Sequence, residues 1–224
     1  MAKILITGAS KGLGKAMFEA LHNSEHQVYG TYNTTSPSIG SPANWFKVDF
    51  SDNAQLIKFI DTALECKFDV LINNFHPGYE FKHAHKSSKT DLVDGFNNYI
   101  LPTLLITNAL IKPMRKAKNG TLIHVLSEVT IKGSPIGLAK YTAEKVYLKS
   151  CHESWHTENH LLGINSISLS PGALPNAADK AIDPRVLTQT IESDQIVPYE
   201  KIISVLSKII SAPAEFAGQN ILIE

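Results

Sequence analysis

Short runs of apolar and β-branched residues alternate along the chain with longer segments in which apolar residues recur every three or four positions. The short runs predict buried strands, because strands of a parallel sheet are covered on both faces. They lie at residues 3–7, 27–32, 45–48, 69–72, 120–126, 163–169 and 219–223. The longer spacing predicts amphipathic helices at residues 13–21, 54–64, 92–117, 139–155 and 199–210.

This alternation predicts an α/β fold of the doubly wound kind. We expect a seven-stranded, mostly parallel sheet with right-handed crossovers and helices on both faces, in three layers. The length of 224 residues predicts a single domain spanning 1–224. Ligands of such sheets bind at the carboxyl ends of the strands.

Two irregular stretches interrupt the pattern, at residues 33–44 and 171–198. The second directly follows a predicted strand, where a substrate lid would lie. Its mixture of apolar and charged side chains predicts a moderately apolar substrate.

Composition narrows the class of protein. Lys and Arg together number 21, as do Asp and Glu, so the net charge of zero argues against a nucleic-acid partner. We expect neither a membrane span nor a signal peptide, because no apolar run approaches about 18 residues. Cys66 and Cys151 form no disulfide framework or metal-ligand spacing, so a cytoplasmic protein is expected.

Three histidines, at positions 152, 156 and 160, recur at helical spacing and could face a metal ion. No further ligand is evident beside them. We therefore interpret them as an ordinary helix surface and expect no metal.

A glycine-rich turn joins the first strand to the first helix. Glycine adopts backbone angles that other residues disfavour, and it lets peptide N–H groups and the helix N-terminus approach a pyrophosphate. A tight turn without a ligand is the alternative interpretation. The predicted cofactor-binding residues of the turn are Gly8, Ser10, Lys11, Gly12, Leu13 and Gly14. Together with the strand pattern, the turn predicts a Rossmann-type dinucleotide site.

The second predicted strand indicates which dinucleotide binds. An acidic residue at its end would accept a hydrogen bond from the ribose 2′-hydroxyl. Residues 28–34 contain no acid, whereas Lys11 places a cation inside the turn. We therefore predict NADP(H) as the preferred cofactor, with NAD(H) as the alternative.

Tyr141 and Lys145 lie four residues apart in a helical pattern, on one face. A free tyrosine has a pKa of about 10, and a nearby ammonium favours the phenolate. The pair therefore indicates acid/base chemistry, with a surface pair as the alternative.

The glycine turn, this pair and the strand order resemble the short-chain dehydrogenase/reductase family along nearly the whole chain. The resemblance implies that Tyr141 donates a proton to a carbonyl oxygen, and that Lys145 lowers the tyrosine pKa and holds the nicotinamide ribose. It implies that Ser127 hydrogen-bonds the same oxygen and that Asn98 supports a proton-relay water. The further cofactor contacts that it implies are Asp49, Asn74, Pro171 and Gly172, together with Tyr141 and Lys145.

The family resemblance also implies a function. It implies an oxidoreductase that interconverts a carbonyl and an alcohol by hydride transfer with a nicotinamide dinucleotide. With the residue-based predictions above, the expected function is an NADP(H)-dependent oxidoreductase acting on a small to medium, moderately apolar substrate. A homodimer or homotetramer is implied, and the apolar residues at 100–111 would suit a helix-helix interface. The alternative is a dinucleotide-binding sensor or scaffold with little or no turnover.

The sequence departs from the family pattern in three places. Phe75 and His76 stand where the family has Ala-Gly, so two large side chains lie beside the cofactor. The spacing from Ser127 to Tyr141 is one residue longer than is commonest, which leaves Glu128 as the alternative to Ser127. The threonine that often follows the Pro-Gly turn is absent, so one cofactor hydrogen bond is expected to be missing.

Overall fold

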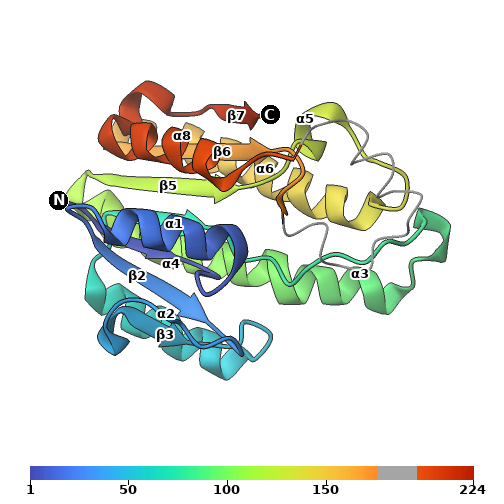
Figure 1. Ribbon diagram of the computed structural model, residues 1–224, viewed down its shortest axis with the longest axis horizontal. Helices are drawn as coiled ribbons and strands as arrows, with labels where there is room; N and C mark the ends of the chain where they lie inside the picture. The colour runs from blue at the N-terminus through green and yellow to red at the C-terminus, as the bar shows by residue number, and fades with distance from the viewer. Residues whose placement is uncertain (176–195) are drawn as a thin grey trace.

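Seven parallel strands form one sheet at the centre of the molecule, in the order β3-β2-β1-β4-β5-β6-β7. The computed structural model describes residues 1–175 and 196–224, so most of the predicted lid lies outside the described residues. The labelled strand arrows point to one side of the molecule, where their carboxyl ends meet (Figure 1). The strands are β1 (Lys3–Ile6), β2 (Gln27–Tyr32), β3 (Trp45–Lys47), β4 (Val70–Asn73), β5 (Gly120–Val125), β6 (Ile164–Pro171) and β7 (Asn220–Ile223). The predicted doubly wound fold is confirmed.

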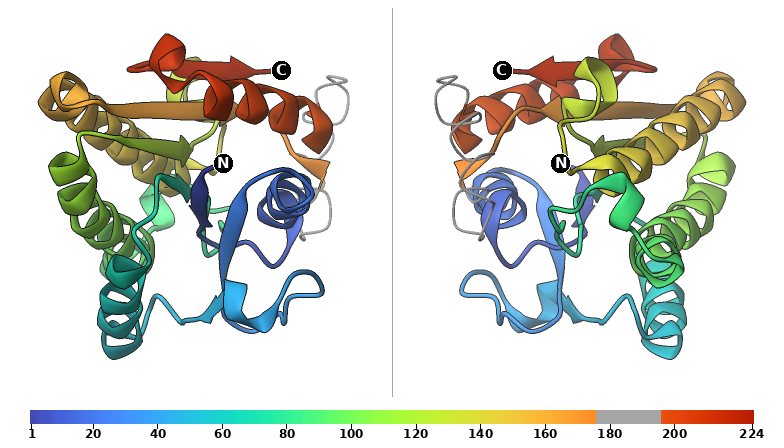
Figure 2. Two further views of the ribbon diagram at one scale, coloured as in Figure 1. Left: turned by 90° about the vertical axis from the view of Figure 1, so that its left-hand side faces the viewer. Right: turned by 90° about the vertical axis from the view of Figure 1, so that its right-hand side faces the viewer.

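Helices cover both faces of the sheet. One face carries α1 and α8, and the other carries α2, α4 and α6 (Figure 2). The α-helices are α1 (Gly12–His22), α2 (Asn53–Cys66), α3 (Lys89–Gly95), α4 (Leu101–Ala117), α5 (Val129–Lys132), α6 (Ala139–Asn159) and α8 (Tyr199–Ser211). Short 3-10 turns lie at η1 (Pro42–Asn44), η2 (Ala84–Lys86), η4 (His160–Leu162) and η6 (Pro213–Phe216). Within the described residues, no helix has both the length and the apolar character that crossing a bilayer requires.

Strand β1 contributes to two separate cores. Ile4 and Ile6 pack into the cluster that contains the buried side of α1 and α8. Leu5, between them, packs into the cluster beneath α2 and α4. Successive side chains of a strand point to opposite faces, so a run that is apolar at every position can fill both layers. This explains why the strands appear in the sequence as continuous apolar runs.

The helix predicted at residues 92–117 is interrupted. The structure has α3, then a π-helical turn η3 (Phe96–Ile100), and then α4. Pro102 at the start of α4 has no backbone N–H, so the carbonyl four residues earlier receives no ordinary helical hydrogen bond. The N–H of Leu101 instead reaches back to the Phe96 carbonyl. Such π-turns are frequent at functional sites.

The prediction of an ordinary helix surface at residues 152–160 is wrong for His152. Its side chain is fully buried, and its Nδ1 atom lies 2.8 Å from the Ser166 hydroxyl on β6. Among the residues that the structure describes, no three His, Cys, Asp or Glu side chains are arranged to hold a metal ion.

Candidate active site

The turn after β1 is built for close approach of the backbone. Gly8 and Gly12 have positive φ angles of 66° and 54°. The Asn74 side-chain amide donates to the Thr7 and Gly8 carbonyls, both at 3.0 Å. A Cβ atom added at Gly14 would lie 2.1 Å from the Gly8 carbonyl oxygen, so the first turn of α1 packs directly on the loop. The residues predicted from the glycine pattern are therefore brought together at the carboxyl end of β1.

The N-terminus of α1 fits the phosphate groups of a dinucleotide. Its N-cap residue, Lys11, makes no side-chain capping bond within the described chain, so the first N–H groups of the helix are not capped in that way. Lys11 is exposed and Ser10 is half-buried beside it. Backbone donors and the positive end of the helix dipole suit a pyrophosphate, and the Lys11 ammonium adds a positive charge.

Asp49 lies just beyond β3, with its carboxylate held by its neighbours. Its Oδ1 atom accepts from the Ser51 N–H at 2.9 Å and from the Ser51 hydroxyl at 2.6 Å. The Ser51 bonds, opposed by desolvation and aided by Asn33, lower the pKa of Asp49. A charged carboxylate is thus presented where the resemblance implies a cofactor contact.

Phe75 does not disrupt the glycine turn. Its N–H donates to the Thr7 hydroxyl at 3.1 Å, and its ring stands edge-on to Phe50 with centroids 4.8 Å apart. The ring packs against the apolar cluster beneath α2 and α4. Its Cα atom, however, would lie 3.0 Å from a Cβ on Gly8, so glycine is required there for packing as well as for its φ angle.

Ser127 and Tyr141 meet in the structure. Ser127 follows β5, Tyr141 lies in the first turn of α6, and their side chains form a hydrogen bond. The Glu128 carboxylate instead pairs with Lys132 at 2.8 Å. This geometry favours Ser127 over Glu128 for the predicted role.

The expectation that Lys145 lowers the pKa of Tyr141 is not met in this structure. Burial raises the pKa of Tyr141 to about 12, although the Ser127 hydrogen bond lowers it in part. The Lys145 ammonium lies 5.7 Å from the centre of the Tyr141 ring and donates its hydrogen bonds elsewhere. Desolvation therefore outweighs the attraction between the ammonium and a phenolate.

Lys145 lies one helical turn after Tyr141 and is only 3% exposed. Its ammonium donates to the Tyr99 hydroxyl at 2.9 Å and to the Val125 carbonyl at 3.0 Å. Burial lowers the pKa of Lys145 to about 7, and the charge of Glu144 opposes this shift. The lysine is therefore poised between its charged and neutral forms near neutral pH.

The contact with Tyr99 was missed by the sequence reasoning. Asn98 is half-buried on the π-helical turn, and its predicted role stays a prediction. The next residue, Tyr99, is the one that touches the Lys145 ammonium. The spacing of residues along a regular helix could not reveal this, because a π-turn changes which side chains face inward.

His76 lies between two tyrosines of the site. Its ring stands edge-on to Tyr99 and Tyr141, with centroids 4.3 and 5.2 Å apart. The Gly78 N–H donates to Nδ1 at 3.0 Å, and Nε2 lies 3.4 Å from the Glu144 carboxylate. Burial disfavours the charge of Glu144, but His76 and Lys140 lower its pKa overall. The side chain that stands in the family's glycine position is thus part of the candidate active site.

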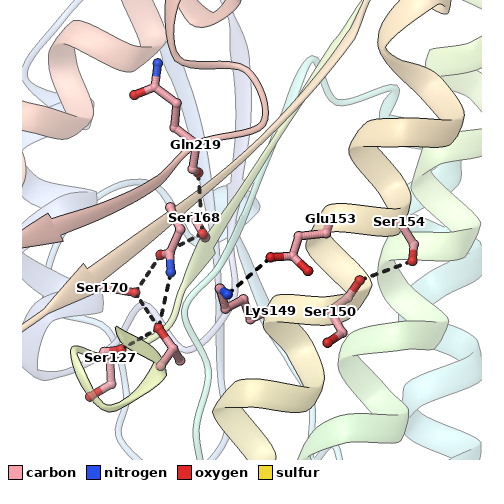
Figure 3. Close-up of polar contacts among 10 residues, drawn as sticks. Ser127, Lys149, Ser150, Glu153, Ser154, Ser168, Ser170 and Gln219 are labelled. Carbon is pink, nitrogen blue, oxygen red and sulfur yellow. Dashed lines mark hydrogen bonds and ion pairs between the residues drawn. The ribbon is translucent and has the colours of Figure 1, made fainter. Parts of the chain in front are cut away.

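A ladder of polar side chains anchors the Ser127 turn to the sheet. Thr130 donates to the Ser127 carbonyl at 2.9 Å, and the Asn220 amide of β7 donates to Thr130 at 3.3 Å. The Asn220 carbonyl oxygen accepts from Ser168 at 2.9 Å and from Ser170 at 2.7 Å. Figure 3 shows Ser168 and Ser170 lying between Gln219 and the turn that carries Ser127. The last two strands therefore support the position of this serine.

The turn after β6 completes the site on its other side. Pro171 ends the strand, and its carbonyl accepts from the Glu128 N–H at 2.9 Å. The Gly172 N–H donates to the Ile223 carbonyl at the same distance. This turn lies beside the Ser127 turn, as expected for the carboxyl ends of neighbouring strands.

Comparison with known proteins agrees with this geometry. The family model described as short chain dehydrogenase matches residues 2–185. The oxidoreductase claN of Passalora fulva is 31% identical over 179 residues, which cover 75% of this chain and 80% of that protein. A 3-ketodihydrosphingosine reductase of Bacteroides thetaiotaomicron is 28% identical over 171 residues, 75% of this chain but only 62% of the relative.

A solved structure shows the same fold. The crystal structure of a 3-ketoacyl-(acyl-carrier-protein) reductase from Brucella melitensis, complexed with NADH, superposes with a TM-score of 0.85. The two chains are 20% identical, and the alignment covers 99% of this chain and 96% of that one. The match of the family model over most of the sequence shows that the chain belongs to the short-chain dehydrogenase family of oxidoreductases.

Proposed function

We propose that the protein is an NADP(H)-dependent reductase that interconverts a carbonyl compound and its alcohol. The observation that carries this proposal is the meeting of Ser127, Tyr141 and Lys145 at the carboxyl ends of the strands, on the side of the glycine turn. Relatives named as reductases support the same reaction class. We further propose a small to medium, moderately apolar substrate.

The state of Tyr141 suits proton donation. Because its pKa is about 12, the phenol keeps its proton at neutral pH and can donate it to a carbonyl oxygen. The Ser127 hydroxyl, bonded to the same phenol, would hold that oxygen during the reaction. A bound nicotinamide dinucleotide supplies the hydride that reaches the carbonyl carbon. Lys145 would hold the nicotinamide ribose.

The preference for NADP(H) is proposed from charge. β2 ends at Tyr32 and is followed by Asn33, so this position supplies no carboxylate of its own, although the charged Asp49 hydrogen-bonds Asn33. The exposed Lys11 in the glycine turn supplies a cation. The Brucella protein was solved with NADH, so the preference must be measured on this chain. Equal or tighter binding of NADH in a fluorescence titration would refute it.

The proposal is tested by replacing Tyr141 with phenylalanine. Oxidation of NADPH is followed against a panel of aldehydes, ketones and quinones. Tyr141→Phe should lower turnover by roughly 10²- to 10⁴-fold, because it removes the proton donor and leaves the ring. NADPH binding should remain nearly unchanged. Tyr147→Phe, on the exposed side of α6, is the matched control. Full activity of Tyr141→Phe would exclude this mechanism.

A dinucleotide-binding sensor or scaffold is the second candidate. The observation that favours it is the pair of large side chains, Phe75 and His76, beside the glycine turn and the tyrosines. Tight NADPH binding without turnover across the whole panel would support a sensor.

We also propose a homodimer or homotetramer. Leu105 and Val146 are exposed on α4 and α6, beside a groove of about 850 Å³ between these helices. Exposed apolar side chains of this kind are suited to an interface between subunits. A monomer in size-exclusion chromatography with light scattering would contradict the assembly.

A further inference from the structure

The Lys145 ammonium is held by groups from outside its own helix. An ammonium has three N–H donors and no acceptor. One donor goes to Tyr99 on the π-helical turn and one to the Val125 carbonyl of β5. Within residues 1–175 and 196–224, the side-chain acceptor of this ammonium is therefore Tyr99. The third donor remains for a ligand or for Tyr141.

Tyr99 is itself firmly placed. It is 2% exposed, and its ring is flanked by Phe75 and His76 with centroids 6.5 and 4.3 Å away. Its carbonyl accepts from the Thr103 hydroxyl at 2.8 Å. Burial raises the pKa of Tyr99 well above its usual value, so the group stays a neutral phenol. A neutral phenol oxygen can accept a hydrogen bond from the charged lysine.

Glu144 supplies the nearby negative charge. Its side chain is 10% exposed, it directly precedes Lys145, and its carboxylate is paired with His76 and Lys140, both at 3.4 Å. Because the Gly78 N–H occupies Nδ1 of His76, the ring proton belongs on Nε2, where it donates to Glu144. His76 thus contacts both the phenol ring and the carboxylate that lie near Lys145.

We propose that Tyr99 and Glu144 are positioning residues that keep the Lys145 ammonium charged and directed toward the reacting centre, and that His76 holds both in place. The proposal rests on the proposed function, because it assigns a role within the same site. It assigns Tyr99, and not Asn98, as the residue that supports the Lys145 ammonium. Among residues 1–175 and 196–224, Tyr99 of the π-turn accepts from the ammonium, and the Tyr141 ring centre lies 5.7 Å from it. The charge of Glu144 acts on Lys145 from the adjacent position, and His76 contacts both Tyr99 and Glu144.

The test measures the titration of Lys145 directly, in cofactor-free protein. The ε-carbon resonance of Lys145, assigned with Lys145→Met, is followed against pH in ¹³C-lysine-labelled protein. The wild-type midpoint is expected near its pKa of about 7. Tyr99→Phe keeps the ring and removes the acceptor from the charged form, so the midpoint should fall by roughly one pH unit. Glu144→Gln should also lower it, because the Glu144 charge raises the pKa of Lys145.

Tyr147→Phe, the same substitution on the exposed side of α6, should leave the midpoint unchanged. An unchanged midpoint in folded Tyr99→Phe would overturn the proposal. If Tyr99→Phe does not fold, Glu144→Gln provides the test. An unchanged Lys145 midpoint in Glu144→Gln would also overturn the proposal. The titration of Lys145 needs neither cofactor nor turnover. A failure of this proposal is therefore distinguishable from a failure of the proposed function, which full activity of Tyr141→Phe would show.

Discussion

Helix α6 buries two ionisable side chains, Lys145 and His152, which lie two helical turns apart and face the sheet. Lys145 lies near the start of the helix, at the carboxyl ends of the strands. Its ammonium has two hydrogen-bond acceptors and the Glu144 charge beside it. His152 lies further along, where its Nδ1 bonds Ser166 and its ring lies 5.8 Å from His124.

The two sites show that burial leaves two ionisable side chains of one helix in different charge states. Burial lowers the pKa of Lys145 to about 7 and that of His152 to about 4. Near neutral pH the lysine can still carry its charge, whereas the histidine is neutral. His124, also buried, stacks on Trp155 with centroids 4.9 Å apart and has its pKa lowered by burial. The histidines form a neutral packing cluster, and the lysine belongs to the site with the glycine turn.

The largest expected effect is the loss of turnover in Lys145→Met. Removing the ammonium should lower turnover by roughly 10²- to 10⁴-fold. The free energy of unfolding should stay close to that of the wild type, because methionine avoids the cost of burying an ammonium and Glu144 keeps His76 and Lys140. NADPH oxidation and urea unfolding measure the two effects. His152→Gln, two turns away, should keep its turnover, and an equal loss in both variants would contradict the comparison.

A smaller effect is expected on stability at acid pH. The pKa of His152 is lowered from 6.5 in the unfolded chain to about 4 in the folded protein, mainly by burial. The stability that its neutral form contributes is complete above pH 6.5 and is lost as the pH falls toward 4. The shift corresponds to about 3 kcal/mol of unfolding free energy. Between about pH 7 and pH 4, the free energy of unfolding measured in urea should fall less steeply in His152→Gln than in the wild type. An identical slope in both proteins would be the contrary result.

The smallest effect concerns the ladder behind Ser127. Thr130→Val keeps the shape of the side chain and removes the hydroxyl that bonds the Ser127 carbonyl, Ser170 and Asn220. The free energy of unfolding should fall by about 1 kcal/mol, and turnover should fall by a few fold, because the serine is less firmly placed. Thr157→Val removes a hydroxyl that donates to the Glu153 carbonyl on the exposed side of α6, away from the ladder, and serves as the control in denaturant unfolding and turnover assays. Equal effects of the two substitutions would show that the ladder does not position Ser127.

Much of the fold could be predicted because the relevant signals are local. The strand boundaries lie within two residues of those expected from the apolar runs. The π-helical turn was not predicted, because Pro102 disrupts the helix there without ending it. The burial of the His152 side chain was also not predicted, because the sequence of a polar helix does not indicate which of its histidines faces the core. Its partner Ser166 belongs to the next strand.

The sequence by itself determined the parallel α/β architecture, the glycine-rich turn at its first crossover and the placement of Tyr141 and Lys145 on one helix face. These features depend on backbone preferences and on spacings of a few residues. Only the tertiary structure decided that Tyr99 holds Lys145, that His76 and Glu144 stand behind them, and that burial raises the pKa of Tyr141. The physical reason is that Tyr99 and Lys145 lie 46 residues apart. Their contact, and the exclusion of water around it, arise only when separate elements pack together.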